Sequence, residues 1–86
     1  MSENNGNEAL KEVIEQLTLL QDDPTVPRNV KNTISEIIKT LNEEKDISIA
    51  VHKALNALDE ISEDVNIEPY TRTQLWDIAS MLEKIS

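Results

Sequence analysis

Apolar residues recur along most of the chain at intervals of three and four positions, the spacing that places one stripe on one face of an α-helix. Four such segments are present, at about residues 8–21, 27–41, 47–61 and 69–85. No segment alternates at the period of a β-strand, so the pattern predicts an all-α protein. The predicted stripes consist of Leu10, Val13, Ile14, Leu17, Leu20, Val30, Ile34, Ile37, Ile38, Leu41, Ile47, Ala50, Val51, Ala54, Leu55, Leu58, Ile61, Leu75, Ile78, Ala79, Leu82 and Ile85.

Proline and capping residues predict where these helices begin and end. Pro24 disfavours the α conformation in the residue before it, so the first helix should end there. Pro27 and Pro69 suit the first turns of the second and fourth helices, where a missing N–H has no cost. Asp46 or Ser48 can cap the third helix. The six residues 22–27 therefore form a helix stop, a rigid turn and a helix start.

The two halves of the chain match each other at an offset of 41 residues. Apolar positions in two hairpins of equal length would match in any case, so the polar turns are the better indication. Asp23 matches Asp64, and Lys31 matches Arg72. We interpret this match as an internal duplication of a helical hairpin.

The first hairpin also resembles the helical hairpins of HEAT repeats. Asp22 lies six residues before Arg28, and in those repeats an acid and an arginine at this spacing tie neighbouring hairpins together. The second hairpin departs from the pattern, because Asn66 stands six residues before Arg72. Two hairpins are too few for an open solenoid, which needs three or more repeats to bury its apolar faces. The expected fold is a compact four-helix bundle in which two antiparallel hairpins close on each other.

Length and composition limit the chain to one small domain. It has 86 residues, and a chain of this size buries only about 60–65% of its unfolded surface, so every apolar stripe is needed. We expect residues 8–86 to form this single four-helix domain. The polar segment 1–7 lies before the first stripe and is expected to be a disordered tail.

Three segments carry a more specific resemblance: DPTVPRNVKN, ALDEISEDVNIEP and YTRTQLWDIASMLEKI. They resemble a small archaeal family of uncharacterised proteins, uncharacterised protein family 0147. The best-matching motifs run from Val26 to Asn29 and from Arg72 to Trp76, and the resemblance covers the chain from about Leu10 onward. It implies a helical bundle in the archaeal cytoplasm. It implies no activity, because none is established for the family.

The charge of the chain bears on its partners. Seventeen acidic and eight basic residues give a net charge of −9, and the basic residues are scattered. Such a surface disfavours nucleic acid, whose nonspecific binding depends on Lys and Arg, although Arg28, Lys31 and Arg72 leave an RNA-binding alternative open. There is no apolar run of about 20 residues that could span a membrane, and there is no cysteine. We expect a cytoplasmic protein without a membrane segment.

Residues that could perform chemistry are few. His52 is the single histidine, and no second nitrogen or sulfur ligand stands at helical spacing from it, so we expect no metal site, no cofactor and no catalytic residue. Carboxylates are the abundant reactive group. Asp22, Asp23, Glu63 and Asp64 end equivalent hairpins and should lie at one end of the bundle. They leave open an alternative function, a divalent-metal-dependent hydrolase.

The best candidate for a binding face contains both aromatic residues of the chain. Trp76 lies at the edge of the fourth stripe, four residues after Arg72, so the guanidinium could stack on the indole. Two interpretations are open: a tryptophan packed at a seam of the bundle, or one that contacts a partner. The candidate face consists of Arg28, Tyr70, Arg72 and Trp76.

Taken together, the sequence favours a small noncatalytic protein-interaction module over an enzyme. The aliphatic core, the paired hairpins and the Arg–Trp edge support this hypothesis. The expected partner is a protein of unknown identity, and a second copy of the chain is one of the candidates.

Overall fold

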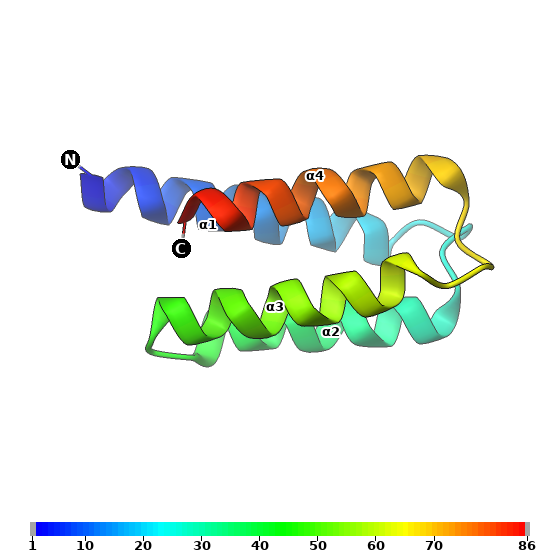
Figure 1. The fold of residues 1–86 in the computed structure, drawn as a ribbon, viewed down its shortest axis with the longest axis horizontal. Coiled ribbons are helices and arrows are strands. Elements are labelled where there is room, and N and C mark those ends of the chain that lie inside the picture. Colours follow the sequence, from blue (N-terminus) through cyan, green and yellow to red (C-terminus); the bar gives the residue numbers. More distant parts are fainter. Residues whose placement is uncertain (1, 86) are drawn as a thin grey trace.

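The computed structural model describes the backbone of residues 2–85 and the side chains of residues 8–85. It contains four helices, α1 (Ser2–Gln21), α2 (Arg28–Glu43), α3 (Ile47–Ser62) and α4 (Pro69–Ile85), and no strand within the described residues. Successive helices run antiparallel, with the α1–α2 and α3–α4 connections at one end of the bundle and the α2–α3 connection at the other (Figure 1). The predicted all-α bundle of two hairpins is confirmed.

Each helix packs against two others in a closed ring: α1 on α2, α2 on α3, α3 on α4, and α4 on α1. The diagonal pairs, α1 with α3 and α2 with α4, are not in contact in the described part of the chain. Every apolar stripe therefore points at a shared centre, as a bundle of amphipathic helices requires. The fully or nearly buried apolar residues are Val13, Leu17, Leu20, Val26, Val30, Ile34, Ile37, Leu41, Ala50, Val51, Ala54, Leu58, Ile61, Ile67, Leu75, Ile78 and Leu82.

The core differs from the predicted stripes at its margins. Ile47, expected in the third stripe, is 41% exposed because it is the first residue of α3 and lies at the open end of the bundle. Val26 and Ile67, which lie outside the helices, are 4% exposed and close the opposite end. Thr71, in the first turn of α4, is also buried.

The helix boundaries confirm most of the expected punctuation. α1 ends at Gln21, before the Asp-Pro pair, and α4 begins at Pro69. Pro27 lies one residue before α2 instead of in its first turn. α1 begins at Ser2, whereas the pattern predicted a start near Glu8. The side chains of residues 1–7 lie outside the described residues, so the disordered tail stays a prediction.

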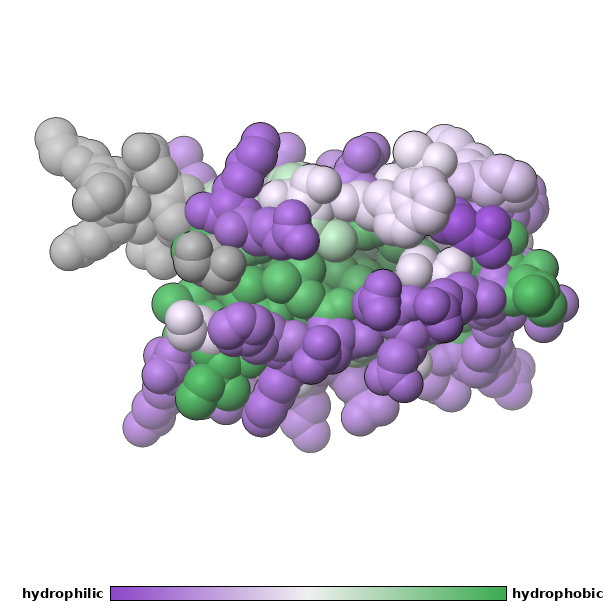
Figure 2. Space-filling model, in the orientation of Figure 1, coloured by the Kyte–Doolittle hydropathy of each residue, from purple (hydrophilic) through white to green (hydrophobic). Residues whose placement is uncertain are grey.

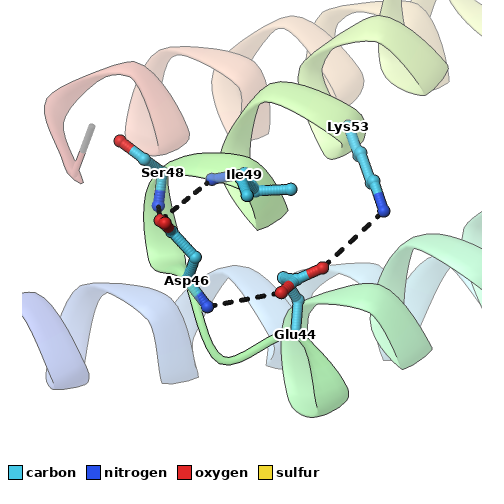
Figure 3. A network of polar contacts seen from close by, with 5 residues as sticks. All are labelled: Glu44, Asp46, Ser48, Ile49 and Lys53. Carbon is cyan, nitrogen blue, oxygen red and sulfur yellow. Dashed lines mark hydrogen bonds and ion pairs between the residues drawn. The ribbon is translucent and has the colours of Figure 1, made fainter.

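The α2–α3 connection is short and held by polar contacts (Figure 3). Asp46 caps α3: its Oδ1 accepts hydrogen bonds from the backbone N–H groups of Ser48 at 3.0 Å and Ile49 at 3.4 Å. Of the two residues considered for this cap, Asp46 is therefore the one used. Glu44 accepts a 3.4 Å bond from the Asp46 N–H and lies 3.7 Å from the Lys53 ammonium. A cap of this kind contributes about 1 kcal/mol.

Candidate functional site

The α1–α2 and α3–α4 connections have the same backbone structure. The amide of Asp23 donates to the carbonyl of Leu20, and the amide of Asp64, 41 residues later, donates to that of Ile61. Three further bonds repeat at the same offset: Asp22 to Leu19 with Glu63 to Glu60, Val26 to Asp23 with Ile67 to Asp64, and Lys31 to Pro27 with Arg72 to Glu68. The repetition of these bonds supports a duplicated hairpin.

In each connection the matching aspartate folds the turn around its carboxylate. Asp23 Oδ1 accepts bonds from the amide of Thr25 at 2.9 Å and from its hydroxyl at 2.7 Å, and these bonds lower the pKa of Asp23. Asp64 accepts 2.8 Å bonds from the side-chain amide of Asn29 and from the backbone amide of Asn66, which lower the pKa of Asp64. Because Asn29 belongs to α2, its bond joins the two connections.

These lowered pKa values give the fold an acid-sensitive end. In the folded chain the pKa values of Asp23 and Asp64 lie below their ordinary value of 3.8, so both carboxylates stabilise the fold above that pH. The contribution is lost as the pH falls through the folded-state values. We expect the urea midpoint to drop between about pH 6 and about pH 2.5, and to drop less in Asp64→Asn. An equal drop in the variant would contradict this assignment.

Arg72 holds the α3–α4 connection through backbone carbonyls. Its Nε donates to the carbonyl of Ser62 at 2.8 Å, and one of its terminal nitrogens donates to the carbonyl of Asp64 at 3.1 Å. The predicted pairing of the guanidinium with the Asp64 carboxylate is therefore replaced by bonds to main-chain oxygens. Bonds of this kind satisfy carbonyls at a helix end that have no partner within the helix.

The first hairpin has the same turn but a different residue at the position of Arg72. Lys31 occupies that position, and the carbonyls equivalent to those of Ser62 and Asp64 belong to Gln21 and Asp23. Lysine lacks the planar fork that reaches two carbonyls.

This asymmetry gives a testable expectation. We expect Lys31→Arg to place its guanidinium on the carbonyls of Gln21 and Asp23 and to raise the free energy of unfolding by about 1 kcal/mol, or ~5 °C in Tm. Thermal melts would measure the shift. Lys39→Arg, at an exposed position of α2, is the matched control and should leave Tm unchanged; equal melting of both variants would contradict the equivalence of the turns.

The acidic hairpin ends do not assemble into a metal site. In the described part of the chain, no group of three or more His, Asp or Glu side chains is arranged to hold a metal ion. Asp23 and Asp64 instead bind Thr25, Asn29 and Asn66 within their own turns. The geometry therefore gives the metal-dependent hydrolase alternative no support.

The surface feature with the best chemistry for binding lies between α3 and α4. A cavity of about 260 Å³ opens there, and Trp76 forms part of its wall. Figure 2 shows this face of the molecule: an apolar band follows the junction of the two helices and is bordered by hydrophilic side chains. We call this feature the α3–α4 groove. Its lining residues are Leu55, Asn56, Leu58, Asp59, Ser62, Leu75, Trp76, Ala79 and Glu83.

Trp76 is the dominant exposed side chain of the groove. It is 57% exposed, whereas its neighbour in sequence, Leu75, is fully buried. Leu55 and Ala79, on the two walls, are partly buried against the core. Trp76 is thus not a core residue. One part of its ring lines the groove, and the rest is in contact with solvent.

The structure separates the four residues of the predicted face. Tyr70, 67% exposed, accepts a 3.2 Å bond from Gln74, which lines the junction of α4 with α1. Six helical positions place Tyr70 about 120° from Trp76 around α4. Arg72 is on the same flank of α4 as Trp76, but its guanidinium is used by the turn.

Arg28 is exposed on α2, which does not touch α4 in the described part of the chain. The HEAT-like tie to Asp22 is absent as well: among the described residues, the Arg28 guanidinium has neither an ion pair nor a hydrogen bond. Whether any of the four residues contacts a partner stays a prediction. The groove residues on α3 were not part of the predicted site, and only the packing of α3 on α4 identifies them.

The fold and the site define a small bundle of two equivalent helical hairpins with an apolar surface groove. The model of the Uncharacterised protein family (UPF0147) matches residues 1–85, so the chain belongs to this family. The predicted resemblance is confirmed.

Relatives and solved structures share this fold. UPF0147 proteins from Archaeoglobus fulgidus and Methanosarcina mazei are 39% identical over 81 residues and 33% identical over 86 residues, covering 94% and 99% of this chain and 93% and 92% of their own. The crystal structure of a family member from Thermoplasma acidophilum matches with a TM-score of 0.88 at 32% identity, covering 93% of this chain and 95% of that one. A crystal structure of a protein of unknown function matches at 0.86 and 36%, covering 93% and 92%.

Proposed function

We propose that this protein is a noncatalytic protein-interaction module of the cytoplasm, and that the α3–α4 groove is its binding face. The observation that carries the proposal is the position of Trp76, which is 57% exposed on the wall of an apolar cavity. A large aromatic side chain next to a partly open apolar floor is the arrangement found at interface hot spots.

The rest of the molecule supports a binding role more than a catalytic one. Catalysis needs a nucleophile, base or metal held in a shared pocket, with pKa values moved toward the working pH. The carboxylates with resolved shifts, Asp23 and Asp64, move away from neutral pH and lie outside the groove. No described helix has the length and apolar character needed to cross a membrane. A rigid helical scaffold with one apolar groove suits recognition of another chain.

Affinity capture from the native cytoplasm tests this proposal. We expect wild-type protein to retain a specific protein that Trp76→Ala loses, because truncation of a hot-spot tryptophan weakens binding by at least about 30-fold. Val65→Ala is the matched control: Val65 is 90% exposed in the α3–α4 connection and does not line the groove. Circular dichroism would confirm that all three proteins are helical. Identical captured proteins for wild type and Trp76→Ala would contradict the proposal.

A further inference from the structure

The charge around the α3–α4 groove is one-sided. Asp59 on α3 and Glu83 on α4 line opposite walls, and the lining includes no lysine, arginine or histidine. By contrast, Lys53 lines the α2–α3 junction, and Lys39 and Lys45 join it near the α2–α3 connection. The apolar groove that carries the exposed tryptophan therefore has a negative border, while basic side chains line cavities on another face.

The length of the groove suits a helix. Its lining runs from Leu55 to Ser62 on α3 and from Leu75 to Glu83 on α4, about 10–12 Å along each helix. Apolar residues at positions i, i+3, i+4 and i+7 of a helix extend over about the same length. An amphipathic helix that enters such a groove uses this stripe as its anchor.

We propose, on the basis of the binding role argued above, that the α3–α4 groove binds a basic amphipathic helix of another protein. Its apolar stripe packs on Leu55, Trp76 and Ala79, and its Lys or Arg side chains lie beside Asp59 and Glu83. Charge complementarity across such a border favours the correct partner and speeds its encounter. A second copy of this chain is disfavoured, because it would bring a net charge of −9 and the same acidic border against the first.

Synthetic peptides without aromatic residues provide the test, because Trp76 is then the single tryptophan in the sample. The probe is a peptide of about 18 residues with Leu at the i, i+3, i+4 and i+7 positions and Lys elsewhere. We expect it to shift the Trp76 emission to the blue in a saturable way. Two control peptides, one with Glu for every Lys and one with Ala for every Leu, should produce no saturable shift.

Protein variants separate groove binding from general attraction to an acidic protein. Asp59→Asn with Glu83→Gln should weaken binding of the Leu/Lys peptide roughly five- to tenfold. Glu36→Gln with Glu43→Gln removes the same charge from α2, outside the groove lining, and should change binding less than twofold.

Three outcomes would overturn the proposal: no saturable shift with the Leu/Lys peptide, equal binding of the Leu/Glu peptide, or equal weakening by the two double variants. A dimer in sedimentation that Trp76→Ala converts to monomer would also overturn it, because the groove would then hold a second copy. If capture still finds a partner that requires Trp76, the interaction module stands and only the basic helix is wrong.

Discussion

Leu75→Ala is expected to lower the free energy of unfolding by about 2–5 kcal/mol. Leu75 is fully buried on α4 and belongs to the single core that all four helices share. The truncation removes the transfer free energy of the side chain and leaves a cavity that the surrounding helices fill only in part. A domain of this size has a total stability of about 4–13 kcal/mol, so the loss is a large fraction of the whole.

Urea denaturation of Leu75→Ala beside Leu19→Ala measures this effect. Leu19 is 63% exposed on α1, so the same chemical change at that position should lower the unfolding free energy by at most about 1 kcal/mol. Equal losses in the two variants would show that the core does not lie where the structure places it.

Arg72→Ala is expected to produce the second largest effect, a loss of about 2–3 kcal/mol. The substitution removes two charge-assisted hydrogen bonds and leaves the carbonyls of Ser62 and Asp64, at the end of α3, without these donors. Arg72→Lys should recover only part of the loss, because an ammonium group cannot reproduce the planar fork.

Arg28→Ala is the matched control for this prediction. Arg28 occupies the first turn of α2, as Arg72 does in α4, but its guanidinium makes no hydrogen bond or ion pair within the described residues. Its removal should change the unfolding free energy by less than about 0.5 kcal/mol. If Arg28→Ala and Arg72→Ala melt at the same temperature, the bonds of Arg72 to the α3–α4 connection do not stabilise the fold.

The helices were predictable because their signal is local. Apolar spacing of three and four residues is a property of each segment alone, and the Asp-Pro pair, Asp46 and Pro69 mark boundaries through the backbone conformations that they allow. The equivalence of the two connections was also visible, because Asp23 and Asp64 bond to amides of their own turns. Contacts of this kind involve residues that are close in sequence.

What the pattern did not predict depends on how distant segments pack. Val26 and Ile67 lie in turns without periodicity, so only the closed end of the bundle shows that they are buried. The acceptors of Arg72 are main-chain carbonyls, which have no side-chain identity in a sequence. For Trp76, the helical wheel gave a position at the edge of the stripe. Whether that edge meets α3 or solvent depends on how the two helices pack, and both are true of different parts of the ring.

The central claim is that the α3–α4 groove is the binding face, and hydrogen–deuterium exchange on the complex with the captured partner tests it most directly. Amide exchange reports local protection along the chain. Binding at the groove predicts slower exchange in residues 55–62 and 75–83, with α1 and α2 unchanged. Protection confined to α1 and α2, with none along α3 and α4, would contradict the claim.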